Sequence, residues 1–314
     1  MIDFSTLKGL TIPEGVVTKI TSNGSVLWEL QSDTTFDTIT LEVSKFTADT
    51  YSGETTYSGE QFVLLDIYPK TNGTVTITYG DLVKTISDTS GATEPNAQQV
   101  FFGTLYGVSD TVETPASGTL TIEGACVAFG VGSFVYNNKS NTDYCSCITA
   151  VNDFGSVSYI PDNAFRECPL EITEIPTGIK SIGDNAFNGC TNVAVSVIPD
   201  GVETIGAGCF LFTNNPFTTS PCLYLPATIK SIGSGAFEYT NGEDFGNYSY
   251  FDDIYIYATT PPTLSASPSN TFGGAYVDSL VFVRSIYVPK GCKEVYDAAE
   301  HWSDNSTSIL EMIE

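Results

Sequence analysis

The stretch Ser181-Ile182-Gly183-Asp184-Asn185-Ala186-Phe187 decides the fold, because the chain repeats it. Related copies end at Phe165, Phe210 and Phe237, so consecutive phenylalanines lie 22, 23 and 27 residues apart. A unit that recurs at such a period cannot bury its apolar face alone. The repeats therefore predict a stack of coils, in which each coil contacts its neighbours and the Phe side chains fill the space between them.

A second pattern lies between these copies, in which a short apolar stretch is followed by proline. It occurs at residues 195–198, 222–225 and 286–288. Proline has no N–H group for the next ladder bond, so each stretch predicts a strand that ends there. We expect these strands to stack in parallel.

The combined pattern Ile-Pro-x-x-Ile-x-x-Ile-Gly-x-x-Ala-Phe, followed in two copies by Cys168 and Cys190, resembles the BspA-like class of leucine-rich repeats. The period agrees, since one such repeat takes roughly 20 to 29 residues. The resemblance covers about residues 148–314 and implies a curved right-handed solenoid used for adhesion or ligand capture, without a catalytic site. Residues 285–309 resemble the terminal segment of that family and predict a last strand followed by a short amphipathic cap.

Residues 1–32 predict a small separate unit, because Asn23-Gly24 between two short β-rich runs is a strong hairpin signal. The pattern Ile-Pro-Glu-Gly, then Ile, then Asn-Gly-x-Val-Leu-Trp resembles the opening segment of structural proteins in phages and prophages of gut bacteria. This resemblance implies an anchor in a virion. The residues expected to make the anchoring contact are Ile12, Pro13, Val16, Ile20 and Trp28. The alternative is a strand pair that packs on the next domain.

Polar and apolar residues alternate along residues 38–43, 74–79 and 119–123, as they do in half-buried strands. About seven such strands predict an immunoglobulin-like β-sandwich, although the Cys, Trp and Cys pattern of a true immunoglobulin domain is missing. We therefore predict a mainly β chain with three parts. They are an anchoring segment at 1–32, a β-sandwich at 33–140 and a repeat solenoid with a short helical cap at 141–314.

The charge balance excludes several kinds of partner. The chain has 37 acidic and 12 basic residues, which gives a formal net charge of −25. Such a field repels nucleic acids and anionic membranes. No apolar stretch is long enough for a membrane span or a signal peptide, so we expect no membrane insertion and synthesis in the host cytoplasm. The redox state of the eight cysteines stays open.

The sequence argues against the common catalytic and metal-binding patterns. His301 is the only histidine, which excludes Ser-His-Asp triads and multi-histidine metal sites. Asp162-Asn163, Asp184-Asn185 and Asp252-Asp253 lack the ligand spacing of a calcium loop and favour solvated turns. A pair of carboxylates acting on a glycoside remains an alternative. We expect neither an enzyme nor a cofactor or metal site.

Aromatic residues gather in the insertion between two repeats, at Tyr239, Phe245, Tyr248, Tyr250 and Phe251. Tyrosine amid Asn, Gly and Asp is typical of adaptable recognition loops, and insertions in repeat proteins often lie on the binding face. We expect this loop to bind a surface glycan or protein. The tyrosines of the following strand, Tyr255 and Tyr257, are expected to pack between coils.

These patterns together predict a phage virion protein associated with the tail. Its N-terminal segment would bind other virion proteins, and its repeat domain would bind a host surface, with several copies or an oligomer per particle raising the avidity. One alternative is a capsid decoration or tail scaffold protein that binds other virion proteins. Another is an adhesin on a bacterial cell surface.

Overall fold

The computed structural model describes two compact units, residues 1–36 and residues 37–314. The described residues are 19–22, 25–29, 38–44, 46–47, 61–88, 96–104, 117–131, 133–135, 142–144, 148–190, 192–193, 195–211, 213, 222–238, 251, 253–266, 271–272, 285–302 and 308–313. Regular structure in these ranges is almost entirely strand, with one short helix, α2 (Lys293–Asp297). The predicted mainly β class is therefore confirmed.

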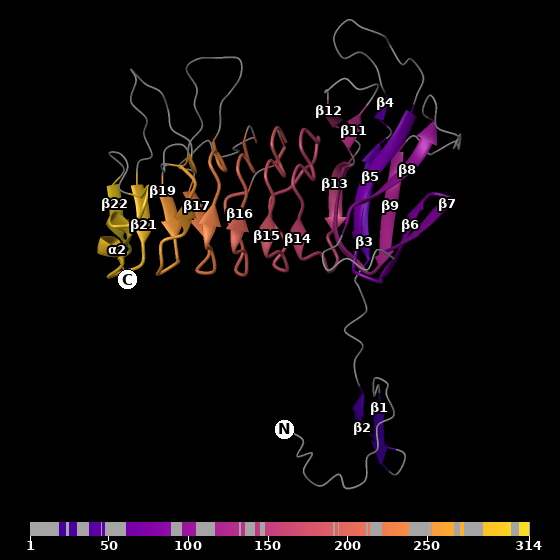
Figure 1. The fold of residues 1–314 in the computed structure, drawn as a ribbon, viewed down its shortest axis with the longest axis horizontal. Coiled ribbons are helices and arrows are strands. Elements are labelled where there is room, and N and C mark those ends of the chain that lie inside the picture. The colour runs from indigo at the N-terminus through magenta and orange to yellow at the C-terminus, as the bar shows by residue number, and fades with distance from the viewer. Residues whose placement is uncertain are drawn as a thin grey trace, which may run out of the picture. The chain divides into compact units, whose positions relative to one another are not determined.

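The first unit contains a β-hairpin. Strand β1 (Lys19–Ser22) pairs antiparallel with β2 (Ser25–Glu29), as the Asn-Gly signal predicts (Figure 1). Two of the predicted anchoring residues face each other across this pair, since Ile20 lies opposite Trp28 in the register. The other three, Ile12, Pro13 and Val16, lie outside the described residues.

The second unit begins with two antiparallel sheets. One has the strand order β13-β3-β9-β6-β7, and in the other β5 lies between β10 and β4 and also pairs with β8. The bounds are β3 (Ile39–Ser44), β4 (Phe46–Thr47), β5 (Gln61–Pro69), β6 (Thr74–Tyr79), β7 (Leu82–Ser87), β8 (Gln98–Thr104), β9 (Ser117–Gly124), β10 (Cys126–Val131) and β13 (Ile148–Asp153). Two short strands, β11 (Ser133–Val135) and β12 (Thr142–Tyr144), pair separately.

Alternation along the strands gives these two sheets a common interior. In β6, Val75, Ile77 and Tyr79 are buried, while the intervening threonines are not. The ring of Tyr79 lies 6.1 Å from that of Phe102 in β8, which belongs to the other sheet. The sheets thus pack face to face, while the immunoglobulin-like topology stays a prediction.

Two parallel sheets follow (Figure 1). Successive coils of the chain lie side by side and connect one sheet to the other. The first contains β14 (Tyr159–Ile160), β15 (Ser181–Ile182), β16 (Thr204–Ile205), β18 (Ser231–Ile232) and β20 (Thr263–Leu264). The second contains β17 (Cys222–Leu225), β19 (Asp253–Ile256), β21 (Ser285–Val288) and β22 (Ser308–Glu311). The parallel stacking predicted for the proline-ended strands is confirmed.

Three details differ from the sequence prediction. The strands of the first sheet come from the repeated phrase itself, and each of them pairs with its neighbour through only two residues. The stretch 195–198 forms a single bridge, from Val197 to Tyr224, instead of a full strand. Beyond the cap, the chain adds one more strand, β22, which pairs with β21.

A column of phenylalanines fills the interior of the coils. Phe165, Phe187, Phe210 and Phe237 stack with ring centroids 5.2 to 5.5 Å apart, and Phe272 continues the column at 6.0 Å. The planes of neighbouring rings differ by 12 to 18°. The prediction that one Phe per repeat fills the space between coils is confirmed. We call this column the phenylalanine stack.

The sandwich closes one end of the phenylalanine stack. Phe129 of β10 lies 5.6 Å from Phe165, the first ring of the stack. The backbones also touch, because a Cβ atom on Gly130 would lie 2.8 Å from the Cα and O atoms of Ala164. The two antiparallel sheets and the coils therefore share one continuous core.

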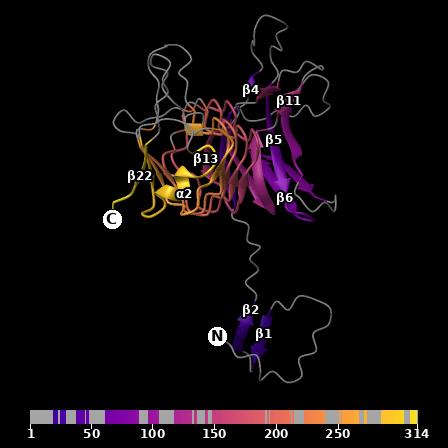
Figure 2. The same cartoon turned by 60° about the vertical axis from the view of Figure 1, so that its left-hand side comes forward.

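Helix α2 and the residues after it close the opposite end, which comes forward in Figure 2. Tyr296 of α2 is fully buried, and its hydroxyl donates a hydrogen bond of 2.8 Å to the carbonyl oxygen of Ala258. The indole Nε1 of Trp302 donates to the carbonyl oxygen of Pro262 at 2.8 Å, and its ring lies 6.4 Å from Phe272. The predicted cap is confirmed.

Candidate functional site

The predicted recognition loop is described only at its end. Phe251 lies edge-on to Phe237 at 6.1 Å and packs against the core, so this residue fastens the loop to the phenylalanine stack. The other four aromatic residues predicted to bind, Tyr239, Phe245, Tyr248 and Tyr250, lie outside the described residues.

A column of tyrosines lies on the outer face of the second parallel sheet. Tyr224, Tyr255 and Tyr287 occupy the same register position in β17, β19 and β21. Their ring centroids are 5.1 and 4.7 Å apart, and neighbouring planes differ by 13 and 9°. The rings are only partly buried, because the alternating apolar residues of each strand take the inner face.

Exposed aliphatic side chains extend this column at both ends. Val197, which bridges to Tyr224, is 54% exposed, and Leu310, which pairs with Tyr287, is 40% exposed. We call the five residues together the tyrosine ladder. A continuous exposed apolar stripe of this kind marks an interaction surface more often than scattered apolar residues do.

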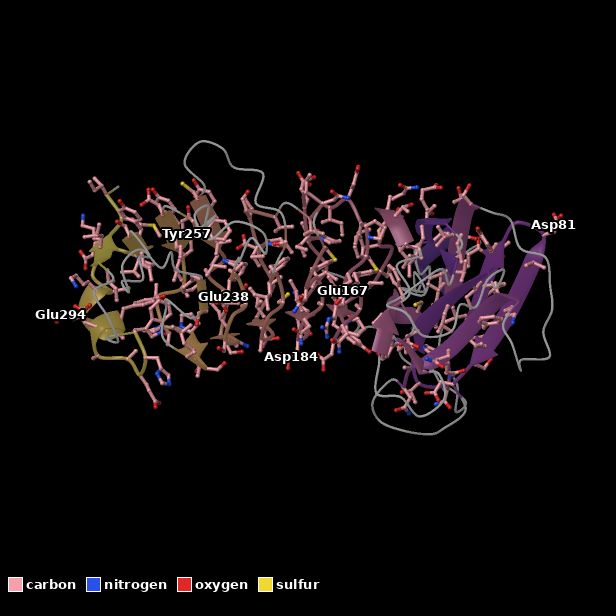
Figure 3. All side chains as sticks on the ribbon, turned by 90° about the horizontal axis from the view of Figure 1, so that it is seen from above. Asp81, Glu167, Asp184, Glu238, Tyr257 and Glu294 are labelled. Atoms are coloured by element: carbon pink, nitrogen blue, oxygen red, sulfur yellow. The ribbon has the colours of Figure 1, made fainter. Side chains whose placement is uncertain are left out.

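The expectation that Tyr255 packs between coils is confirmed, because its ring stacks between Tyr224 and Tyr287 of the neighbouring coils, whereas the same expectation for the exposed Tyr257 is wrong. Tyr255 makes these contacts on the outer face, because Ile254 and Ile256 point inward. Tyr257 is 47% exposed and is labelled in Figure 3. Aligning the strands on their proline would have shown two of the three tyrosines, since Tyr224 and Tyr287 stand two residues before Pro226 and Pro289, but no proline follows Tyr255 at that spacing.

Stacking decides what the ladder presents to a partner. The ring centroids are 4.7 to 5.1 Å apart and the ring planes are nearly parallel, so the faces of the rings are covered by the neighbouring rings. The ladder therefore offers ring edges and a column of phenol hydroxyls. Burial raises the pKa of Tyr224 and Tyr255, with further contributions from Cys222 for the former and Asp253 for the latter. These hydroxyls stay protonated at neutral pH and act as hydrogen-bond donors.

The insertions of the repeat domain lead into this same sheet. The stretches 214–221, 239–250, 273–284 and 303–307 lie outside the described residues. Each precedes one of β17, β19, β21 and β22, whose strands are parallel and in register. The strands that follow these stretches thus all begin at the same edge of the sheet that carries the tyrosine ladder, and residues 239–250 of the predicted recognition loop precede β19.

The acidic residues proposed as turn formers have a structural role. Oδ1 of Asp162 accepts a hydrogen bond of 2.8 Å from the backbone N–H of Asp184 in the next coil. Oδ1 of Asp184 in turn accepts one of 2.7 Å from the N–H of Ala207. Within the described ranges, no group of three or more His, Cys, Asp or Glu side chains is arranged to hold a metal ion. No helix among the described residues is long and apolar enough to span a membrane.

Acidic side chains are spread over the whole second unit. Asp81 lies in the turn between β6 and β7, Asp184 and Glu238 lie on the coils, and Glu294 lies on α2 (Figure 3). A negative field of this extent favours neutral or cationic partners.

Most of the described cysteines are buried in the core. Burial raises the pKa of Cys126 and of Cys190 to about 12 and that of Cys209 well above its usual value. The buried thiols are Cys126, Cys168, Cys190 and Cys209, whereas Cys222 and Cys292 are partly exposed.

We expect thiol reagents to label Cys222 and Cys292 in the native protein and to leave the four buried thiols unmodified until urea is added. Even at pH 9 Cys126, Cys190 and Cys209 should react slowly, because burial raises the pKa of each thiol and disfavours the reactive thiolate. The unfolded chain releases those protons near pH 9, so the free energy of unfolding should fall as the pH rises from about 9 toward 12. Mass spectrometry after brief alkylation tests the labelling, and Cys190 reacting as fast as Cys222 would contradict it.

Comparison with known families identifies part of the chain. The family model of the BspA type leucine rich repeat region matches residues 138–244 in six copies. No curated protein matches the chain. The resemblance inferred from the repeated phrase is therefore confirmed over this range, and it indicates a surface-binding or adhesin-type protein. Strands β19, β21 and β22 continue the same sheet beyond the matched residues.

Proposed function

From a repeat region of the BspA type that carries an exposed tyrosine ladder, we propose that the chain is a surface-recognition protein. The tyrosine ladder forms its binding face. The observation that carries the proposal is the stacking of the partly exposed Tyr224, Tyr255 and Tyr287 in one continuous column. Tyrosine is enriched at the energetic centres of protein interfaces, since it combines a large contact area with a hydrogen-bonding hydroxyl. The role is binding, without catalysis or a cofactor.

In finer terms, the protein belongs to a phage virion, where it is associated with the tail and binds a ligand on the bacterial host. The resemblance of residues 1–32 to phage structural proteins supports this assignment. So does the separation of residues 1–36 as a compact unit of their own. Several copies on one particle would convert weak single contacts into avidity.

An adhesin on a bacterial cell surface is the second candidate, and the repeat match favours it. Immunogold electron microscopy of an induced lysate separates the two. Label on phage tails supports the virion assignment, whereas label on cell walls with unlabelled particles supports the adhesin. Label on capsids would indicate a decoration protein instead.

Replacing Tyr255 by Ser is expected to weaken binding to intact bacterial cells about tenfold or more, because this ring lies at the centre of the ladder and contacts both neighbours. Purified full-length protein, fluorescently labelled and titrated onto a panel of gut bacteria, gives the measurement. The matched control is Val83→Ser, which changes an exposed side chain on the sandwich strand β7 (61% exposed). Equal binding by Tyr255→Ser and the wild type would reject the ladder as the binding face.

A further inference from the structure

The first parallel sheet carries an open groove along its outer face. The groove has a volume of about 760 Å³ and extends over all five strands of that sheet. It starts at Tyr68 of the sandwich strand β5 and Tyr159 of β14, and it ends at Thr263 and Ser265 in the last coil. It therefore runs along the axis of the stack and crosses one coil after another.

One side of the groove is a row of hydroxyl groups. The first residue of every strand contributes one, and the parallel register aligns all five. These residues are Tyr159, Ser181, Thr204, Ser231 and Thr263. Neighbouring strands of a sheet lie about 4.8 Å apart, so the hydroxyl groups of Ser181, Thr204, Ser231 and Thr263 recur at about that interval along the groove.

The remaining lining carries small residues and two acids. Gly183, Gly206 and Gly233 follow the strands, and a Cβ atom on any of them would meet the backbone of the preceding coil, so these glycines let the coils approach closely. The charged residues of the lining are Asp162 and Asp184, and neither Lys nor Arg contributes to it. Oδ1 of each carboxylate accepts a hydrogen bond from a backbone N–H group of the next coil, which holds both side chains in place.

The sandwich supplies an aromatic end to the groove. Tyr68 and Tyr159 meet edge to face with their ring centroids 5.9 Å apart. Burial, together with the charges of Asp66 and Asp162, raises the pKa of Tyr68, so its hydroxyl stays a donor at neutral pH. An aromatic ring beside hydroxyl and carboxylate groups can contact both the apolar and the polar parts of a small ring-shaped ligand.

The residues that line the groove determine which kind of ligand it can bind. The acids repel polyanions, and the overall charge of −25 adds to that repulsion. A folded protein partner usually needs a deep apolar pocket for an anchoring side chain, and the lining of this groove is instead shallow and rich in hydroxyls. A linear polymer with hydroxyl groups at a regular spacing meets a matching row of donors and acceptors.

We propose that this groove is a second binding site, which holds a linear, uncharged glycan lying along the axis of the stack with one end at Tyr68 and Tyr159. The site belongs to the sheet of β14, β15, β16, β18 and β20, whereas the tyrosine ladder belongs to the sheet of β17, β19, β21 and β22. The groove thus goes beyond the proposed recognition function and does not depend on it.

The test uses calorimetric titration of the full chain with short linear oligomers of glucose, mannose and N-acetylglucosamine, and with oligogalacturonate as an anionic comparison. We expect at least one neutral oligomer to bind and oligogalacturonate not to bind. Thr204→Trp places an indole across the middle of the groove and should weaken that binding about tenfold or more. Thr263→Trp does so at the last coil. Both residues are exposed, so circular dichroism should show an unchanged fold.

Three results would overturn the proposal. They are no binding of any neutral oligomer to the wild type, binding of oligogalacturonate as tight as that of the best neutral oligomer, or equal binding by the wild type and both folded variants. Tyr255→Ser separates this site from the tyrosine ladder. It should leave oligomer binding unchanged while weakening attachment to cells, so the two proposals can fail independently.

Discussion

Phe187→Ala is expected to lower the free energy of unfolding by about 3 to 5 kcal/mol, the usual range for removing a buried phenylalanine. The side chain is fully buried in the middle of the phenylalanine stack, with Phe165 at 5.5 Å on one side and Phe210 at 5.3 Å on the other. Backbone hydrogen bonds tie each coil to the next, as from Phe187 N–H to the carbonyl oxygen of Cys209 at 2.8 Å. The coils therefore cannot close in on the cavity that the substitution leaves.

Urea denaturation followed by circular dichroism measures this effect. Val197→Ala is the control, because this residue belongs to the same set of coils but is exposed and lies outside the core. Its truncation should change the free energy of unfolding by no more than about 0.5 kcal/mol. Since each coil contacts only its neighbours, Phe187→Ala should also split the transition, with the two ends unfolding separately. A loss no larger than that of Val197→Ala would show that the rings do not carry the stability of the stack.

Gly206→Ala is expected to lower the free energy of unfolding by about 1 to 3 kcal/mol, the range for forcing extra volume into a packed core. A Cβ atom at this position would overlap the backbone of Gly183 and Asp184 in the preceding coil. Backbone atoms cannot rotate away as the end of a side chain can. The two coils would have to separate, and the hydrogen bond of 2.8 Å from Gly206 N–H to the carbonyl oxygen of Ile182 would lengthen.

Thermal unfolding of Gly206→Ala alongside Gly178→Ala provides the comparison. The added methyl group of Gly178→Ala would meet the carbonyl oxygen of Val157 at 3.5 Å, which is ordinary contact. Its melting temperature should stay the same or rise slightly, because alanine restricts the unfolded chain. If both variants have the same melting temperature, the close approach of the coils at Gly206 does not limit how they stack.

The sequence predicts the parts of this fold that repeat or that a single residue type controls. The phenylalanine stack follows from the spacing of Phe165, Phe187, Phe210 and Phe237, and β17 and β21 follow from the prolines that end them. The first parallel sheet is not predicted, because each of its strands has two residues and shows no periodicity. Neither is the contact of Gly130 with Ala164, because it joins segments that no local pattern connects.

The candidate site was predicted in part. The insertion at 239–251 was identified by its composition, and the structure connects it to the sheet of the tyrosine ladder. The ladder was missed because Tyr224, Tyr255 and Tyr287 lie about 31 residues apart, which exceeds the window used for periodicity. Whether a strand turns its tyrosine outward depends on which neighbours reach the core, and that is decided only when the coils stack.

Because Phe129 closes one end of the phenylalanine stack and Trp302 closes the other, the stack can be lengthened from within without disturbing either end. Duplication of one internal repeat in the gene would add a whole coil and leave both closures intact. Each such event would extend the stack by about 4.8 Å, the spacing of neighbouring strands. It would also add one phenylalanine to the core and one hydroxyl group to the groove. The length of the stack can therefore change during evolution in steps of one coil.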